Sequence, residues 1–309
     1  MNDRKKKVNS AISFAKSFIN ISEDSIDYTT KKGFIQYIIS SMKRVDITGS
    51  GAQLAFFFLL SFFPLLIFLV TLLPYLNLRQ DQVFEFMDDI MPDEIFTMAQ
   101  SILGEVLQTQ NGGLLSIGVV GTLWSASRGV HALIRSLNRA YDVEGKKNFI
   151  NRFWSLIFTI GFVVIILIAL LLPVFGQQIL NLVMTYLTID WHLGRVWTFV
   201  RWIMPPLLIW VLLLLMYWIV PNTNPRIKFF SVWPGAIFST VGWLALTYGF
   251  SFYINNFGNY SATYGSIGGV IILMLWLYFT GMILIFGGII NSTRLKREQA
   301  LLIKKINNP

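Results

Sequence analysis

Long runs without a charged or histidine side chain dominate the pattern of apolar and polar positions in this chain. Five such runs cover residues 47–78, 106–127, 153–189, 202–225 and 229–293. A helix needs about 20 mostly apolar residues to cross about 30 Å of hydrocarbon. The polar stretch 255–261 divides the last run, so this run can hold two crossings. The pattern therefore predicts six transmembrane helices, and the fold class is an all-α, polytopic membrane protein.

Four prolines fall within the predicted spans. Pro64 and Pro74 lie in the first span, and Pro205 and Pro206 lie near the outer end of the fourth. Proline lacks a backbone N–H and leaves a carbonyl of the preceding turn without its partner. Membrane helices tolerate this change, usually with a bend. We therefore expect helix kinks at these four positions.

The second predicted span, about residues 113–133, is the least apolar of the six. It carries a stripe of small residues formed by Gly118, Gly121, Ser125 and Gly129. Small residues at helical spacing let two membrane helices approach closely. We expect this stripe to be a helix–helix contact.

Basic residues are strongly biased to alternate segments between the runs. Residues 1–46, 128–152, 226–228 and 294–305 hold 22 of the 25 Lys and Arg residues. The positive-inside rule then places both termini in the cytoplasm and the loop 79–105 outside. We predict three parts, namely a basic N-terminal segment (1–46), a six-helix domain (47–293) and a basic tail (294–309).

Several segments outside the spans have amphipathic spacing. Residues 8–19 and 34–42 each have one apolar side beside lysines or arginines, which is typical of helices lying on a membrane surface. Two further helices are expected in the outside loop 79–105, which is rich in acidic residues. This loop could bind a protein partner, so a non-catalytic scaffold is one candidate function.

Composition agrees with a membrane location. The chain is 54% hydrophobic and 13% charged, and it has no cysteine, so disulfides and thiolate metal sites are excluded. Its basic excess follows the segments on one side of the membrane rather than a patch on a soluble domain. We therefore expect anionic membrane lipids as partners and no nucleic acid. A homo-oligomer is compatible with the pattern.

The usual catalytic signatures are missing from the sequence. His131 and His192 fall on opposite sides of the membrane in this topology, so they cannot share a metal ion. We find no His-Glu-x-x-His, Gly-x-Ser-x-Gly or Walker A motif. No carboxylate lies within a predicted span, although such groups usually carry proton coupling. We expect no enzymatic activity, no cofactor and no metal.

Two polar groups of residues are candidate substrate-binding sites. The first lies at the inner end of the second span and comprises Arg128, His131, Arg135 and Asn138. It is either a helix end whose arginines reach the headgroups or a site for an anionic phosphate. The second lies outside, between the fifth and sixth spans, and comprises Asn255, Asn259, Tyr260, Tyr264 and Ser266. It is either a structural turn or the lining of a polar vestibule.

Three motifs indicate a family. They are Ser61-Phe62-Phe63-Pro64-Leu65-Leu66, Leu123-Trp124-Ser125-Ala126-Ser127-Arg128-Gly129-Val130, and Trp233-Pro234-Gly235-Ala236 followed by the stretch 253–268. In order and spacing the chain resembles the YihY/BrkB family of bacterial inner-membrane proteins over about residues 43–291. That family often ends its last span with Gly-Ala-Glu-Leu-Asn. Here the corresponding residues are Gly287-Gly288-Ile289-Ile290-Asn291, so a mechanism that uses this glutamate does not carry over.

The resemblance also implies what the chain does. The family is linked with envelope integrity and with the movement of lipids or lipid-linked precursors, and it long carried the label ribonuclease BN. A nuclease needs a metal or an acid–base cluster on the RNA side, and the short cytoplasmic segments suggest none. Our hypothesis is a transporter or flippase for an anionic lipid or lipid-linked envelope precursor. The alternative is a non-catalytic envelope-integrity scaffold that binds partners through the acidic outside loop 79–105.

Overall fold

The computed structural model describes residues 26–72, 96, 112–145, 148–187, 193–224, 226–257 and 267–307. These residues form helices and connecting turns, with no β-strand among them. The helices are α2 (Lys31–Val45), α3 (Ile47–Leu72), α6 (Gly112–Ala140), α7 (Asn148–Leu187), α8 (Leu193–Ile219), the short 3₁₀ helix η3 (Phe229–Val232), α9 (Trp233–Phe257) and α11 (Ile267–Asn307). The predicted all-α fold is confirmed.

Five of the described helices are long and apolar enough to cross a membrane. The qualifying stretches are Ile47–Leu69, Phe149–Ala169, Trp202–Ile219, Phe229–Ile254 and Gly268–Asn307. They correspond to the first and the third to sixth predicted spans. The second predicted span lies within α6, whose glycines, serines and Arg128 lower its hydropathy. The protein is therefore a polytopic membrane protein, and the difference between five and six concerns α6 alone.

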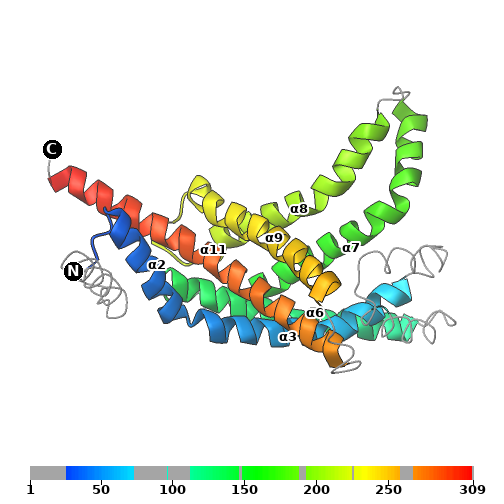
Figure 1. The fold of residues 1–309 in the computed structure, drawn as a ribbon, viewed down its shortest axis with the longest axis horizontal. Helices are drawn as coiled ribbons and strands as arrows, with labels where there is room; N and C mark the ends of the chain where they lie inside the picture. Colours follow the sequence, from blue (N-terminus) through cyan, green and yellow to red (C-terminus); the bar gives the residue numbers. More distant parts are fainter. Residues whose placement is uncertain are drawn as a thin grey trace, which may run out of the picture.

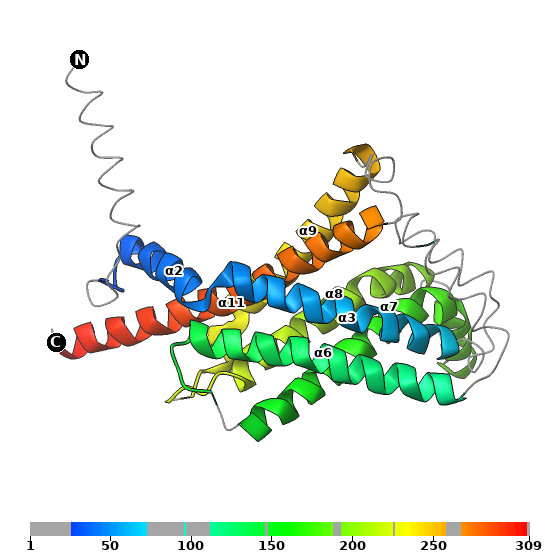
Figure 2. The same ribbon diagram turned by 90° about the horizontal axis from the view of Figure 1, so that it is seen from below.

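Helices α3 and α6 lie side by side along most of their length (Figure 2). A Cβ atom added to Gly118 would lie 2.9 Å from the backbone nitrogen of Phe68, and one added to Gly129 would lie 2.8 Å from the ring of Phe58. A Cβ at Gly121 would lie 3.2 Å from Pro64 Cβ. These contacts are tighter than ordinary van der Waals packing. The small-residue stripe of α6 is thus the contact with α3.

The predicted prolines lie inside continuous helices wherever the structure describes them. Pro64 lies within α3, and Pro205 and Pro206 lie within α8. Pro74 lies outside the described residues. The kinks themselves stay a prediction, and none of these prolines ends its helix.

The best-buried apolar side chains gather where α6, α8, α9 and α11 meet. Leu133, Leu137, Leu213, Ile285 and Ile289 all have an exposed fraction of 0%. Helices α7 and α8 extend from this core side by side (Figure 1). The exposed side chains of these two helices include the large apolar residues Phe149, Phe153, Ile160 and Trp202. Exposed apolar side chains are expected on a helix that faces lipid rather than water.

The amphipathic stretch 34–42 lies within α2. Thr30 caps this helix, because its side-chain oxygen accepts a hydrogen bond of 3.0 Å from the Gly33 amide. The face that packs against the protein contains Gly33, Tyr37, Ser41 and Val45. The location of the apolar side on a membrane surface stays a prediction. Ile35 is 50% exposed. Tyr37 and Ser41 both accept hydrogen bonds from Arg44 in a polar network described below. The stretches 8–19 and 79–105 lie outside the described residues, apart from Phe96.

Candidate functional site

Arg128 lies on the exposed side of α6. Its guanidinium carbon is 4.1 Å from the centroid of the Trp124 ring, one helical turn earlier. Arg128 is exposed, and Trp124 is 51% exposed. A guanidinium over an indole face gains about 0.5–1 kcal/mol at an exposed site. The contact holds the arginine close to the helix, and no hydrogen bond joins its N–H groups to another residue that the structure describes.

The exposed side of α6 changes from apolar to cationic along the helix. Ile117 and Val120 are 67% and 66% exposed and precede Trp124 at helical spacing. Arg128 and Arg135 follow on the same side and are both exposed. We call Ile117, Val120, Trp124, Arg128 and Arg135 the α6 track. It offers an apolar surface that continues directly into guanidinium groups, which matches the two ends of an anionic lipid.

A second cationic group joins α6 to α7. The positive charges of Arg135 on α6 and Arg152 on α7 act on the imidazole ring of His131, and the ring also interacts with the backbone of Asn151. The Nδ1 atom of His131 is buried and has no hydrogen-bond partner among the described residues. Sequence reasoning omitted Arg152, although it lies on the same predicted side of the membrane as Arg135.

Asn138 does not join these exposed arginines. Its exposed fraction is 4%, and its amide donates to the Ile134 carbonyl at 3.1 Å. Its side-chain oxygen accepts a hydrogen bond of 3.3 Å from the Asn222 amide. The first bond lies within α6, and the second ties the C-terminal end of α6 to the turn after α8. The structure gives Asn138 a structural contact rather than a place beside the guanidinium groups.

The outer candidate group is described only in part. Asn255 lies near the end of α9, and its side chain lies outside the described residues. Asn259, Tyr260, Tyr264 and Ser266 also lie outside the described residues. This group stays a prediction.

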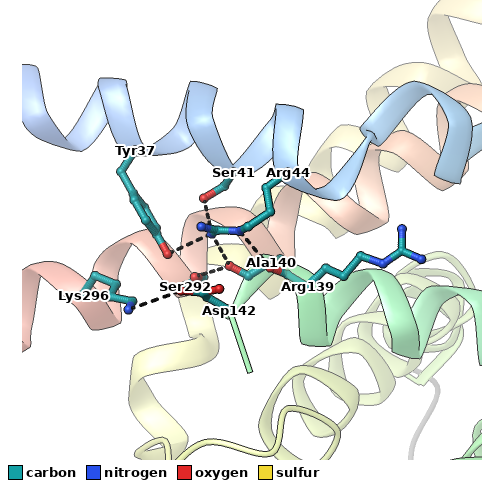
Figure 3. A network of polar contacts seen from close by, with 8 residues as sticks. All are labelled: Tyr37, Ser41, Arg44, Arg139, Ala140, Asp142, Ser292 and Lys296. Atoms are coloured by element: carbon teal, nitrogen blue, oxygen red, sulfur yellow. Dashed lines mark hydrogen bonds and ion pairs between the residues drawn. The ribbon is translucent and has the colours of Figure 1, made fainter. Parts of the chain in front are cut away.

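Figure 3 shows a polar network where α2 meets the C-terminal end of α6 and an interior turn of α11. Arg44 Nη2 donates to Tyr37 Oη and Ser41 Oγ, both at 3.0 Å. Arg44 Nε donates to the Arg139 carbonyl at 3.1 Å, while Ser292 Oγ of α11 donates to the Ala140 carbonyl at 2.6 Å. The last carbonyls of a helix have no partner within it. Here neighbouring helices supply the donors, so the network fixes the α6 end between α2 and α11.

A second buried network holds α9 against α11. Asn291 Oδ1 accepts a hydrogen bond of 2.8 Å from the Gly235 amide, and Asn291 Nδ2 donates to the Val232 carbonyl at 3.0 Å. A Cβ at Gly287 would collide with Ser239 Oγ and would lie 2.7 Å from the Gly235 carbonyl oxygen. Glycines thus permit the close approach, and Asn291 fixes the start of α9. Sequence reasoning did not assign Asn291 a role, although an amide at the end of an apolar run was the available signal.

The fold and these contacts define a multi-pass, all-α membrane protein with exposed cations at one end of its helices. The family model of "Virulence factor BrkB" matches residues 38–305. The chain therefore belongs to this family, which confirms the family indicated by the motifs.

Similar proteins carry two kinds of name. The chain is 43% identical over 267 residues to the "Putative ribonuclease-like protein YfkH" of Bacillus subtilis (strain 168), covering 86% of this chain and 96% of that protein. It is 23% identical over 280 residues to a "UPF0761 membrane protein" of Vibrio campbellii, covering 86% and 83%. A "UPF0761 membrane protein" of Actinobacillus pleuropneumoniae serotype 5b is 40% identical over 91 residues, or 29% and 32% of the two chains. No solved structure matches this chain significantly.

The name of YfkH corrects one expectation. We expected no enzymatic activity, but this relative of 43% identity is named as ribonuclease-like. The expectation rested on missing sequence motifs, and a fold can assemble a site from distant residues without any local motif. Among the residues that the structure describes, no group of three or more His, Asp or Glu side chains could hold a metal ion. Ribonuclease-like activity is therefore a second candidate function.

Proposed function

We propose that this protein is a transporter or flippase-like protein for an anionic lipid or a lipid-linked envelope precursor. The observation that carries the proposal is the α6 track. Its apolar part, Ile117, Val120 and Trp124, is exposed to the surroundings of the helix and leads directly to Arg128. An acyl chain would pack along the apolar part while the headgroup phosphate binds the guanidinium.

The energetics of arginine near hydrocarbon support an anionic ligand. An arginine at the centre of a membrane helix costs about 2.5–3.5 kcal/mol on insertion scales, and less toward the helix end. No ion pair joins Arg128 to a carboxylate among the described residues. A phosphate offers the guanidinium two parallel charge-assisted hydrogen bonds and neutralises its charge. An anionic headgroup would therefore satisfy a side chain that has no counterion within the described part of the protein.

The proposal includes a location and an orientation in the bacterial cell membrane, with both termini in the cytoplasm. The basic bias of alternate segments supports this orientation, and it places Arg128 and Arg135 toward the inner leaflet. Because the chain has no cysteine, single cysteines introduced at Ser10 and Ser101 can be labelled without background. In intact cells, an impermeant maleimide should label the cysteine at position 101 and not the one at position 10. The reverse pattern would contradict the orientation.

Lipid movement by the purified protein tests the function. Liposomes carrying the protein and fluorescent phosphatidylglycerol are treated with an impermeant quencher, and empty liposomes show the fraction that stays protected. We expect the protein to expose the inner-leaflet phosphatidylglycerol faster than it exposes labelled phosphatidylcholine. Absence of any lipid movement by protein that elutes as a folded species would overturn the proposal.

The second candidate is a ribonuclease-like activity, which the name of YfkH favours. Its test is cleavage of labelled RNA by rigorously purified protein supplied with divalent metal ions. Activity that co-purifies with the protein and disappears with a point substitution in this chain would support it. Activity that survives every such substitution would come from a contaminant.

A further inference from the structure

The last two turns of α11 carry large apolar side chains that no other described element covers. Leu302 and Ile306 are 62% and 76% exposed, and Ile303 between them is exposed as well. Leu295, two helical turns before Leu302 and on the same side of the helix, packs against the core. The side of α11 that packs on the protein therefore continues uncovered into the last turns. We call Leu302, Ile303 and Ile306 the α11 stripe.

The α11 stripe lies too far along the helix for the hydrocarbon of the membrane to cover it. Helix α11 is continuous from Ile267 to Asn307, and its uncharged run ends at Thr293. Ile306 follows Thr293 by 13 residues, which is about 20 Å at 1.5 Å per residue. The headgroup layer on each side of the hydrocarbon is only about 5–8 Å thick. A typical tilt of about 20° shortens the distance by only a few per cent. The cover of the stripe is therefore protein rather than lipid.

The N-terminal end of α2 points toward the α11 stripe. The guanidinium carbon of Arg297 on α11 is 5.8 Å from the centroid of the Phe34 ring near the start of α2. At the other end of α2, Arg44 donates to the Ala140 carbonyl at 3.4 Å, and Ser292 of α11 donates to the same carbonyl. Helix α2 therefore runs antiparallel to α11, and α11 extends past the start of α2 (Figure 1). The chain thus enters α2 close to the stripe.

The sequence before the first described residue, Ile26, contains a segment whose length and pattern match the stripe. Within residues 8–19, apolar residues recur at the spacing of one side of a helix, namely at Val8, Ile12, Ala15 and Ile19. A helix of this length would extend about 18 Å, close to the distance from Leu295 to Ile306 along α11. The linker 20–25 spans about 20 Å when extended, so the segment can reach the stripe. Such a short tether gives the segment an effective concentration of about 1 mM or more at the stripe.

Charge favours this segment over a second copy of the α11 end. Residues 294–307 carry five Lys or Arg and one Glu, so pairing two of these ends brings like charges together. Residues 8–19 contain a single charged side chain, and the linker 20–25 that follows them is acidic, with Glu23 and Asp24. The linker therefore complements the lysines that flank the stripe.

We propose that residues 8–19 form an amphipathic helix that packs on the α11 stripe. The contact ties the two ends of the chain together beside α2. It covers apolar side chains that water would otherwise surround, and it gives the apolar side of the segment a protein partner in place of the membrane surface. The contact concerns how the chain ends are held, so it is independent of the substrate proposed above.

Disulfide cross-linking of the full-length protein in liposomes tests the contact, since the chain has no cysteine of its own. Ala15→Cys is combined with Leu302→Cys, because both positions are central and meet whichever way the segment runs. We expect a disulfide within one chain to form at least about fivefold faster than in the control pair Ser13→Cys with Leu302→Cys. Ser13 lies on the opposite side of the segment from Ala15. Non-reducing electrophoresis and mass spectrometry of tryptic peptides identify the bond.

A second substitution in the cross-linking pair tests the apolar character of the contact. Ile306→Asp should slow the cross-linking by about fivefold or more, because it places a charge in an apolar contact. Asn307→Asp is the matched control, since it adds the same charge at the next exposed residue, and it should leave the rate unchanged. Equal slowing by both substitutions, or no disulfide above the Ser13 control, would overturn the proposal. A disulfide between two chains would assign the stripe to a second copy, and one that forms in detergent but not in liposomes would assign the segment to the membrane surface. Either result would also overturn it.

Discussion

Two polar regions of this protein differ in how their groups find partners. Where α2, α6 and α11 meet, Arg44 and Ser292 donate to backbone carbonyls or to neighbouring hydroxyls. The second region comprises Arg128 and Arg135 on the exposed side of α6 and Arg152 near the start of α7. None of these three arginines has a carboxylate partner among the described residues. In the first region the hydrogen-bond donors have acceptors within the protein. In the second region the guanidinium groups could bind an anionic ligand.

The contrast separates structural arginine from candidate binding arginine. A buried or partly buried polar group that has its hydrogen bonds stabilises a helix contact, and its loss leaves the partners unsatisfied. An exposed guanidinium contributes little to folding and much to recognition of an anion. Substitutions in the first region should therefore change stability, and substitutions in the second should change function. The predictions below test this division.

The largest effect is expected from Gly287→Leu. Any side chain at position 287 collides with Ser239 Oγ and lies close to the Gly235 carbonyl and Tyr217 Oη. Overpacking a tight helix contact costs about 3 kcal/mol or more, which is a large part of total stability. We expect loss of the monodisperse peak in fluorescence-detected size exclusion. Gly249→Leu is the control, because a Cβ there meets nothing within 4 Å. A normal peak for Gly287→Leu would contradict the described packing of α9 on α11.

Asn291→Ala should be the next most damaging. It removes the partners of the Gly235 amide and the Val232 carbonyl, both at the buried start of α9. Leaving two buried backbone groups unsatisfied costs about 3 kcal/mol in total. The expected result is a clearly lower midpoint of thermal unfolding in detergent. Asn222→Ala, which removes an exposed side chain at a turn, serves as the comparison and should shift the midpoint less.

Arg44→Lys should have a moderate effect. A lysine can reach one acceptor but cannot bind Tyr37, Ser41 and the Arg139 carbonyl together. We expect a loss of about 1–2 kcal/mol, because charge-assisted hydrogen bonds at a partly exposed site are replaced in part by water. Thermal unfolding measures it, with Arg226→Lys as the exposed control. Equal midpoints of thermal unfolding for the two variants would show that the hydrogen bonds of Arg44 do not stabilise the fold.

Arg135→Gln should have the smallest effect on stability. Its side chain is exposed and forms no ion pair among the described residues, so we expect a change within about 0.5 kcal/mol. A loss as large as that of Arg44→Lys would show that Arg135 is structural, and the division drawn above would fail at that residue.

The sequence predicted the fold well because one physical signal dominates it. Runs of apolar residues mark the helices, and the stripe of Gly118, Gly121 and Gly129 correctly indicated a close helix contact. The buried face of α2 was not predictable in this way. Tyr37 and Ser41 lie inward, where both accept hydrogen bonds from Arg44, and Arg44 also donates to the Arg139 carbonyl of α6. No local sequence pattern encodes where that carbonyl lies.

The candidate site was predicted in part, and helix geometry explains the rest. At about 100° per residue, Arg135 lies within about 20° of Arg128 around the α6 axis, whereas Asn138 is turned away by about 80°. Asn138 therefore faces the core, where it binds Asn222. Arg152 could not be assigned from spacing, because its position beside Arg135 depends on how α7 packs on α6. The outer group around Tyr260 stays a prediction.

The central claim is that the exposed arginines of α6 act on an anionic lipid rather than on the fold. The most direct measurement compares the rate of phosphatidylglycerol movement in liposomes for the wild type, Arg128→Lys and Arg226→Lys. Both variants keep the charge and should insert normally. We predict a rate about tenfold lower for Arg128→Lys alone, because lysine lacks the planar fork that binds phosphate through two hydrogen bonds. Wild-type rates in Arg128→Lys, or an equal loss in Arg226→Lys, would contradict the claim.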